Sequence, residues 1–137
     1  MHLISVTGGS ITRLATNDPR CSQIVKYAGI VYLTGQVASK ELLSKSDVTQ
    51  QTLQTLAKID ALLAEAGTSK SRLIEARIWL RDISKDFAGM NAVWNKWVSP
   101  DNKPTRVCTE ARLAHPDMLV EIQVTAAEGQ IGGRSRL

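Results

Sequence analysis

The chain has 137 residues, of which 43% are hydrophobic and 22% are charged, as expected for one globular domain with one core. Its formal net charge is +4, without a dense basic cluster or interleaved aromatic side chains, so the composition argues against nucleic acid as a partner. No apolar run is long enough to cross a membrane, and residues 1–10 do not resemble a secretory signal. We therefore expect a cytoplasmic protein in which the distant Cys21 and Cys108 are free thiols.

The first part of the chain predicts two antiparallel strands after a short leading segment. Residues 3–13 are interrupted by glycine and form either an edge strand or a loop. Residues 23–27 alternate in polarity, and residues 30–36 are rich in β-branched and aromatic side chains. Ala28 and Gly29 lie between the two segments as a turn signal, so these segments predict a β-hairpin.

A helix is predicted over residues 48–66. Asp47 is a suitable N-cap, and Gln50 stands at the position that a capping box requires. Gly67 offers a left-handed residue after the last turn. The apolar side chains recur every three or four residues and form one stripe, which consists of Leu53, Leu56, Ile59, Leu62, Leu63 and Ala66.

The second part of the chain predicts a strand, a helix and two more strands. Residues 72–82 alternate, which indicates a strand whose buried face carries Ile74, Ala76, Ile78 and Leu80. Ser84 is the expected N-cap of a helix over residues 85–98, whose apolar face contains Phe87, Met90, Trp94 and Trp97 or Val98. Residues 105–113 and 118–127 also alternate, and the turn between them predicts that they pair as a hairpin.

This order of elements predicts an α+β fold within residues 1–128, followed by a loose tail over residues 129–137. Two amphipathic helices can cover only one face of the sheet. The other face is expected to carry charged residues together with Trp79, Cys108 and Leu119. Such a mixed face is often half of a subunit interface, so we expect a homo-oligomer.

Familiar catalytic and metal-binding motifs are absent from the sequence. It contains no HExxH, CxxC, P-loop or GxGxxG pattern. The two histidines, His2 and His115, are far apart, and neither a zinc site nor a Ser-His-Asp triad can be built from them. We therefore expect no metal, and we expect His115 to be a solvated turn residue.

Candidate chemistry lies on the polar face of the last two predicted strands. Arg106 and Cys108 share a face, and Glu121 would lie on the neighbouring strand of the hairpin. An arginine can hold a planar carboxylate by two hydrogen bonds, and a nearby carboxylate can orient a water and move protons. The alternative is an ordinary cross-strand ion pair between Arg106 and Glu121. For Cys108, the lack of a histidine base favours a buried small residue over a nucleophile.

Three stretches occur in an order that resembles one known family. Residues 31–37 read VYLTGQV, residues 86–97 read DFAGMNAVWNKW, and residues 104–111 read PTRVCTEA, followed by LVEI at residues 119–122. From about residue 22 to residue 127 the chain resembles the reactive intermediate deaminase family, which is called RidA or YjgF. The R-x-C and L-V-E-I stretches are the most specific part of this resemblance.

The resemblance implies a chorismate-mutase-like α+β fold, a homotrimer, and sites in clefts between subunits. It further implies hydrolysis of reactive enamines and imines, such as 2-aminoacrylate, to 2-keto acids and ammonia, without a metal or an organic cofactor. The partner would be a small imino or keto acid. Positioning and one oriented water would suffice for this reaction, because imines hydrolyse readily.

By position, the resemblance assigns Arg106 to the substrate carboxylate, and it assigns Glu121 and the backbone around Cys108 to the attacking water. It also assigns pocket positions to Thr34, Gly35 and Asn91.

One departure from the family pattern concerns the segment before the first hairpin strand, where the family's deaminases carry a tyrosine. Cys21 or a neighbour stands there in this chain, and Thr34 replaces the commoner serine. Two further functions therefore remain open: a regulatory trimer that binds a small carboxylate without converting it, and a protein that acts on nucleic acid.

Overall fold

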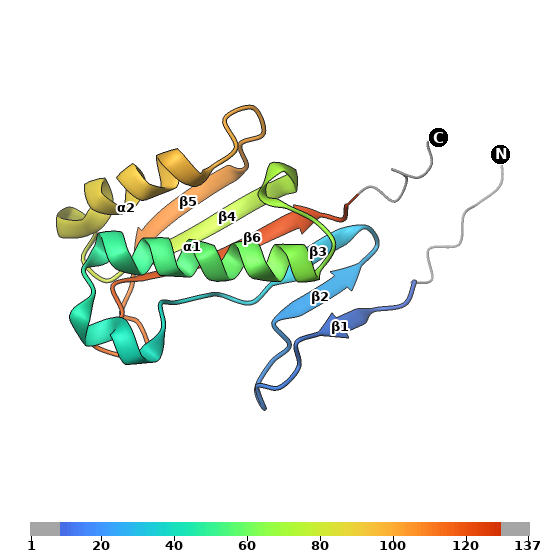
Figure 1. The fold of residues 1–137 in the computed structure, drawn as a ribbon, viewed down its shortest axis with the longest axis horizontal. Helices are drawn as coiled ribbons and strands as arrows, with labels where there is room; N and C mark the ends of the chain where they lie inside the picture. The colour runs from blue at the N-terminus through green and yellow to red at the C-terminus, as the bar shows by residue number, and fades with distance from the viewer. Residues whose placement is uncertain (1–8, 130–137) are drawn as a thin grey trace.

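The computed structural model describes residues 9–129, which form one six-stranded sheet and two α-helices (Figure 1). The strands are β1 (Thr12–Leu14), β2 (Ile24–Tyr27), β3 (Ile30–Leu33), β4 (Leu73–Leu80), β5 (Thr105–Glu110) and β6 (Val120–Ala127). The helices are α1 (Val48–Glu65) and α2 (Ile83–Trp97), with short 3-10 helices η1 (Lys40–Lys45) and η2 (Lys70–Arg72). The predicted α+β class is confirmed. The predicted loose tail, apart from Gly129, lies outside the described residues.

The strands follow the order β1-β2-β3-β6-β4-β5 across the sheet. The predicted hairpin of β2 and β3 is confirmed, and Ala28 and Gly29 take the positive φ angles of 52° and 82° that a tight hairpin turn requires. The leading segment forms the edge strand β1, which pairs antiparallel with β2. None of the helices described between residues 9 and 129 is long and apolar enough to span a bilayer.

The predicted hairpin of the last two strands is wrong. β4 lies between them, paired in parallel with β5 and antiparallel with β6. The reason is that α2 carries the chain back along the sheet after β4, as in a parallel crossover, so β5 runs in the same direction as β4. The segment of residues 111–119 then leads past β4 to the centre of the sheet, where β6 also pairs with β3.

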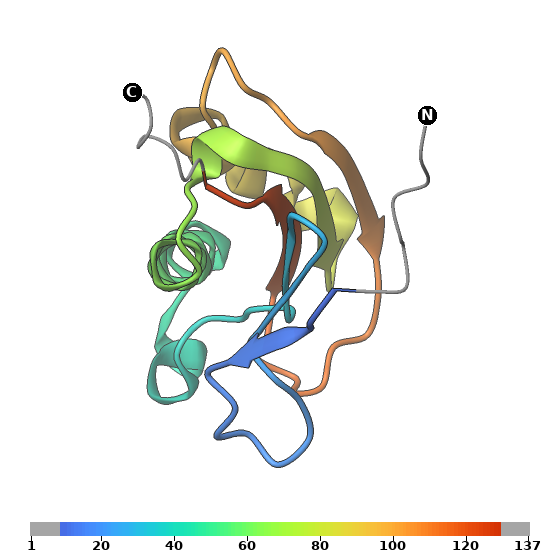
Figure 2. The same cartoon turned by 90° about the vertical axis from the view of Figure 1, so that its right-hand side faces the viewer.

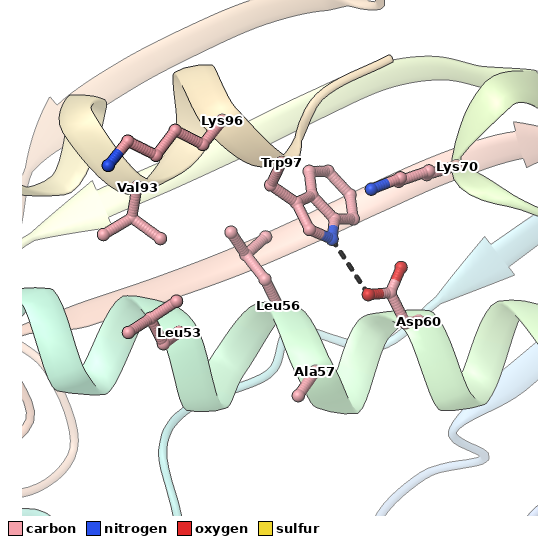
Figure 3. Close-up of a pocket in the computed structure, with 8 residues that line it drawn as sticks. All are labelled: Leu53, Leu56, Ala57, Asp60, Lys70, Val93, Lys96 and Trp97. Carbon is pink, nitrogen blue, oxygen red and sulfur yellow. Dashed lines mark hydrogen bonds between the residues drawn. The ribbon is translucent and has the colours of Figure 1, made fainter.

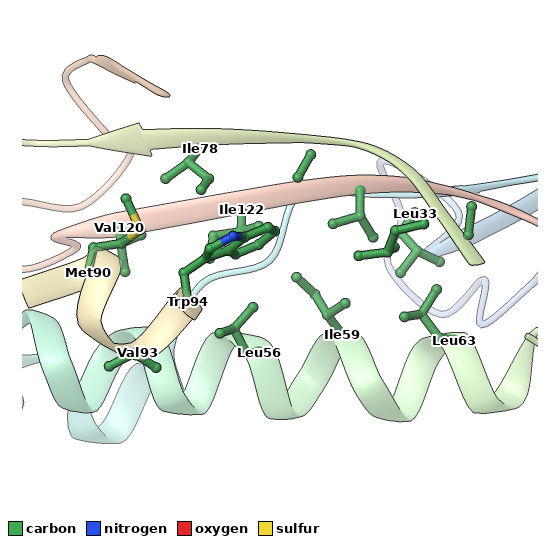
Figure 4. Packing of buried hydrophobic residues seen from close by; sticks show 14 of the residues in the cluster. Leu33, Leu56, Ile59, Leu63, Ile78, Met90, Val93, Trp94, Val120 and Ile122 are labelled. Atoms are coloured by element: carbon green, nitrogen blue, oxygen red, sulfur yellow. The ribbon is translucent and has the colours of Figure 1, made fainter. Parts of the chain in front are cut away.

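Both helices lie on one face of the sheet, as predicted (Figure 2). The hydrophobic core fills the space between the helices and the sheet. Figure 4 shows Leu56, Ile59 and Leu63 of α1 pointing toward the strands. Alternate residues of β6 are fully buried there, namely Val120, Ile122, Val124 and Ala126. The opposite face of the sheet is not covered by any described element, and it exposes Tyr32 and Val107.

The N-cap predicted for α1 is confirmed, and the N-cap predicted for α2 is wrong. The capping box of Asp47 and Gln50 is present at the start of α1, and Gly67 after its end has a φ of 83°. The N-cap of α2 is Asp82, whose side chain accepts a hydrogen bond from the backbone of Lys85, and not the predicted Ser84. Asp is at least as good a cap as Ser, so the helix begins two residues earlier.

Three apolar residues that were predicted to be buried are exposed. Leu53 is 56% exposed, Phe87 is 43% exposed and Ile74 is 42% exposed. For Ile74 the reason is a register shift between Leu73 and Glu75, which turns its side chain to the opposite face of β4. Leu53 and Phe87 lie on α1 and α2, and no register shift accounts for their exposure.

The buried side of α1 also carries polar residues that the periodicity did not indicate. Thr52 and Thr55 are fully buried, and each hydroxyl donates to the carbonyl four residues earlier at 2.7 Å. Gln51 is fully buried too, and its amide nitrogen donates to the Asp117 carbonyl at 2.8 Å. Its amide oxygen accepts from the Leu119 backbone at 2.9 Å. Gln51 therefore ties α1 to the segment that leads into β6.

Replacing Gln51 by leucine should lower the free energy of unfolding by about 3 kcal/mol, because the part-buried backbone groups of Asp117 and Leu119 lose their hydrogen-bond partners. Urea denaturation followed by circular dichroism measures this change. The control is Gln50→Leu at the neighbouring exposed position, which removes one capping bond and should cost about 1 kcal/mol or less. Equal losses in both variants would contradict the role of Gln51.

Candidate functional site

Arg106 lies on the edge strand β5, on the face of the sheet that the helices cover. Its register partners are Ala76 of β4 and, one strand further, Val124 of β6, and both are buried in the core. The guanidinium donates a hydrogen bond to Oδ1 of Asn91 on α2 at 2.8 Å. It also lies over the ring of Trp94, 5.6 Å from the ring centre. These two contacts fix the direction of the guanidinium.

The remaining donors of Arg106 have no partner among residues 9–129. Asn91 is the one hydrogen-bond partner of its side chain in this part of the chain, and no carboxylate there forms an ion pair with it. A guanidinium has five N–H donors in a flat fork. The half-buried Arg106 is thus oriented by an amide and an indole, while most of its donors stay available to an anion.

Cys108 shares this face with Arg106, as predicted, but the face is the covered one. Its register partner is Ile78, and its side chain packs against the core, so the expectation that Cys108 belongs to the uncovered face is wrong. The same correction applies to Leu119. Burial raises the pKa of the Cys108 thiol, and the nearby Arg106 opposes this shift less strongly. The side chain is therefore a neutral thiol near pH 7, which agrees with a buried small residue.

Glu121 lies on the opposite, uncovered face, beside Gly35. The segment that contains Gly35 is held against β6 by two backbone hydrogen bonds between Gln36 and Ile122, of 2.8 and 3.0 Å. A Cβ atom at Gly35 would overlap Oε2 of Glu121, so only glycine leaves room for this carboxylate. The neighbour of Gly35 is thus a side chain of the candidate site.

A cavity of about 210 Å³ opens beside Glu121 on the uncovered face. Its walls are formed by Trp79, Ala111, Arg112, Leu113 and Glu121. Burial raises the pKa of the Glu121 carboxyl group above its ordinary value. A carboxyl group with a raised pKa exchanges protons closer to neutral pH, which suits a general acid and base.

The structure separates Arg106 from Glu121 within one chain. Glu121 is paired with Trp79, whereas Arg106 is paired with Ala76, and positions an odd number of residues apart on β4 point to opposite faces. The predicted cross-strand ion pair between Arg106 and Glu121 is therefore wrong. The predicted site residues form two groups: Arg106 with Asn91 on the covered face, and Glu121 with Gly35 on the uncovered face.

Thr34 and Cys21 lie next to the Gly35 segment. The Thr34 hydroxyl donates to the backbone carbonyl of Ser22 at 3.0 Å, which fastens the segment before β2 to the end of β3. The Gln23 side chain lies 3.9 Å from the sulfur of Cys21, and both cysteines are free thiols, as predicted.

Another cavity, with a volume of about 330 Å³, lies between the two helices (Figure 3). Leu53 and Leu56 of α1 and Val93 of α2 line it. At one end Trp97 donates to Asp60 at 3.0 Å, and the Lys70 ammonium lies 5.2 Å from the centre of the Trp97 ring. The cavity shares no lining residue with either group of the candidate site, and the contacts at its end are ones that stabilise helix packing.

Metal ligation has no support in the described part of the chain, since residues 9–129 contain no group of three or more acidic, histidine or cysteine side chains suited to an ion. His115 is exposed in its turn, where its Nδ1 accepts from the Asp117 backbone at 3.0 Å.

The sequence did not indicate that Trp94, Trp79 or Arg112 belongs to the candidate site. Trp94 was predicted as a core residue only, and its ring also supports the Arg106 guanidinium. Arg112 was predicted within a strand, but β5 ends at Glu110 and Arg112 turns toward the cavity of Glu121. The one signal for Arg112 in the sequence was a positive charge just after a strand, and this signal is too common to indicate a site.

Comparisons with known proteins agree with this fold. The model of the family described as Endoribonuclease L-PSP matches residues 13–128. A RutC family protein of Haemophilus ducreyi is 44% identical over 117 residues, which cover 85% of this chain and 96% of that protein. The RutC family protein YoaB of Escherichia coli is 37% identical, over 80% of this chain and 92% of its own.

Solved structures give the same result. The crystal structure of NMB1025 from Neisseria meningitidis, a member of the YjgF protein family, superimposes with a TM-score of 0.82 and 40% identity. The match covers 88% of this chain and 97% of that one. The chain therefore belongs to the YjgF family, which is also called RidA. A further member, YyfA of Yersinia pestis, has a TM-score of 0.76 at 26% identity, over 86% and 99% of the two chains.

Proposed function

We propose that this protein is a deaminase that hydrolyses reactive enamines and imines of small 2-keto acids, with 2-aminoacrylate as the type substrate. The observation that carries the proposal is the Arg106 guanidinium, which Asn91 and Trp94 orient while its other donors lack partners among residues 9–129. A planar fork of donors without a carboxylate partner suits a small carboxylate ligand.

The proposed reaction uses Glu121 as the group that moves protons. The enamine tautomerises to the imine, and the carboxylate of Glu121 then takes a proton from a water whose oxygen bonds to the imine carbon. The electron pair of the C=N bond moves to nitrogen, which takes this proton from Glu121, and a carbinolamine results. The Glu121 carboxylate then takes the hydroxyl proton of the carbinolamine and passes it to the amino nitrogen, so that the C–N bond breaks, ammonia leaves and a C=O bond forms. The carboxylate is regenerated, and no cofactor takes part.

We propose that the site is completed by a second copy of the chain. Arg106 and Glu121 lie on opposite faces of one sheet, so they can face one substrate if neighbouring subunits each contribute one of them. The uncovered face supports such packing, because it exposes apolar Tyr32 and Val107 beside the half-buried Trp79. A homotrimer with three equivalent clefts, the assembly that the sequence predicts by resemblance, meets this requirement. Sedimentation velocity measures the assembly directly.

The function is tested by ammonia and keto-acid release from enzyme-generated 2-aminoacrylate. Arg106→Ala should reduce kcat/KM at least about a hundredfold, because the substrate carboxylate loses a bidentate charged contact. Arg106→Lys should recover only part of this loss, since an ammonium cannot form the flat fork. Lys103→Ala is the control, because it removes an exposed positive charge near β5 without changing the Arg106 contacts.

Wild type that performs no better than Arg106→Ala on several imino acids would refute the deaminase proposal. In that event, calorimetric binding of pyruvate that depends on Arg106 would support the alternative, a trimer that binds a small carboxylate without converting it. The name of the matching family model refers to an endoribonuclease, and binding of RNA at low salt is the measurement that would test such a role here.

The rate should fall at acidic pH because of Glu121. Burial raises the pKa of this carboxyl group, and the ionised form takes the proton from water, so activity is present above the raised pKa. As the pH falls through that value, log kcat/KM should fall, and the decline should begin at a higher pH than for an ordinary glutamate. The measurement is a pH profile of wild type and of Glu121→Gln, which should be slow at every pH and lack this decline.

A further inference from the structure

Arg112 is a positively charged residue in the wall of the Glu121 cavity, and the proposed reaction does not use it. Its side chain is exposed, and it takes part in none of the ion pairs found among residues 9–129. By contrast, the guanidinium groups of Arg72 and Arg81 donate to backbone carbonyls. The packing of a single chain therefore does not account for the guanidinium of Arg112.

The backbone on both sides of Arg112 is held in place. The amide of Ala111 donates to the carbonyl of the last residue of β4 at 3.0 Å. The carbonyl of Leu113 accepts from the Arg81 guanidinium at 3.3 Å. The same guanidinium donates to two further carbonyls in the segment of residues 111–119, at 2.9 and 3.1 Å. A ligand at Arg112 would therefore not have to order this segment first.

Arg112 and Glu121 line the same cavity without pairing with each other. No ion pair joins them, and burial raises the pKa of the Glu121 carboxyl group without an opposing effect from a cation. The cavity volume is about 210 Å³, which corresponds to roughly seven water molecules at ~30 Å³ each. The cavity can therefore take a short side chain of a substrate, but not a bulky one.

The charge of Arg112 decides which short side chain fits this cavity. The other walls include the apolar side chains of Trp79, Ala111 and Leu113. An apolar substrate side chain could pack against them, but it would displace water from the guanidinium without giving it a partner. A carboxylate satisfies the guanidinium through two charged hydrogen bonds. An acidic side chain is thus favoured over an apolar one of the same length.

We propose that the substrates preferred by this protein are imines and enamines of 2-keto diacids, whose second carboxylate binds Arg112. This inference rests on the proposed deaminase function. Arg106 of one subunit holds the carboxylate next to the imine carbon, and the subunit that contributes Glu121 also contributes Arg112. The reacting carbon lies between the two carboxylates, where Glu121 acts on it. The reaction is unchanged: 2-iminosuccinate and water give oxaloacetate and ammonia.

The test compares two imines with four carbon atoms each, 2-iminosuccinate from L-aspartate and 2-iminobutanoate from L-2-aminobutanoate. An amino-acid oxidase produces each imine in place, with catalase present. Wild type should have a kcat/KM for 2-iminosuccinate about tenfold or more above that for 2-iminobutanoate. Arg112→Gln should reduce this ratio about tenfold or more, and Arg112→Lys should restore part of it. Lys103→Ala, which removes an exposed charge outside the cavity, should keep the wild-type ratio.

An unchanged ratio in Arg112→Gln, or an equal loss on both imines, would overturn the inference, because Arg112 would then serve the fold or the assembly. Either result leaves the deaminase proposal standing if turnover of 2-iminobutanoate depends on Arg106. If neither imine is converted, the deaminase proposal fails, and calorimetry with succinate and butanoate decides the inference. Succinate should then bind more tightly than butanoate, and Arg112→Gln should remove the difference. Equal binding of the two acids by wild type would overturn the inference.

Discussion

Two inactive variants should restore each other's activity when their subunits are mixed. Arg106→Ala retains Glu121, and Glu121→Gln retains Arg106, so a cleft between one subunit of each kind can contain both intact residues. In the proposed homotrimer, random mixing of equal amounts of the two chains should leave about a quarter of the clefts intact. Deamination of 2-aminoacrylate after subunit exchange, compared with each variant treated in the same way, measures this recovery.

The physical basis of this result is the separation of the two residues by the sheet. Arg106 is held on the covered face by Asn91, and Glu121 lies on the uncovered face beside Gly35. If both residues of one chain served the same site, every cleft in the mixture would contain one lesion and no activity would return. As a further control, wild type is mixed in equal amounts with the double variant that carries both Arg106→Ala and Glu121→Gln. About a quarter of all clefts in this mixture should be intact if each site is shared between two subunits, and about half if each site lies within one subunit.

Gly35→Ala should lower kcat on the order of a hundredfold while changing the free energy of unfolding by less than about 1 kcal/mol. The added Cβ would overlap Oε2 of Glu121, so the carboxylate must leave its present position. The backbone of Gly35 is not in the left-handed region, and alanine can therefore adopt its conformation without strain. Steady-state kinetics and urea denaturation measure the two effects.

A shorter carboxylate provides the matched control for this prediction. In the Gly35→Ala background, Glu121→Asp withdraws the carboxylate by one methylene and should recover part of the lost rate. Gly9→Ala should have no effect, since no atom lies near the added Cβ at Gly9. Full activity in Gly35→Ala would mean that the position of Glu121 is unimportant for the reaction.

Local sequence rules predicted the features that depend on neighbouring residues. The turn at Ala28 and Gly29 and the capping box of Asp47 and Gln50 each need only a few adjacent positions, and both are present. The close approach of Gly35 to Glu121 is a different case, because it joins positions far apart in the sequence and no local rule indicates it. The wrong prediction of Ser84 as the N-cap of α2 is also a local error of only two residues, because Asp82 is an equally good cap.

The arrangement of the strands could not be predicted in the same way. Alternation assigns Arg106 and Cys108 to one face of a strand, but it does not say which strand lies alongside or which residues pair. Inserting β4 between β5 and β6 changes the partners of both strands, and a change of register by one residue moves every side chain to the other face. For this reason the sequence put Arg106 and Glu121 together, whereas the fold separates them.

The position of β6 has a consequence for how the chain folds during its synthesis. β6 is the last strand of the described residues 9–129, yet it joins β3 to β4 in the middle of the sheet. Until residues 120–127 have left the ribosome, β1-β2-β3 and β4-β5 are two incomplete sheets with unpaired inner edges. Such long-range pairing slows folding, and the open edges are prone to intermolecular association in the meantime. Nascent chains stalled before β6 should therefore depend on chaperones for solubility.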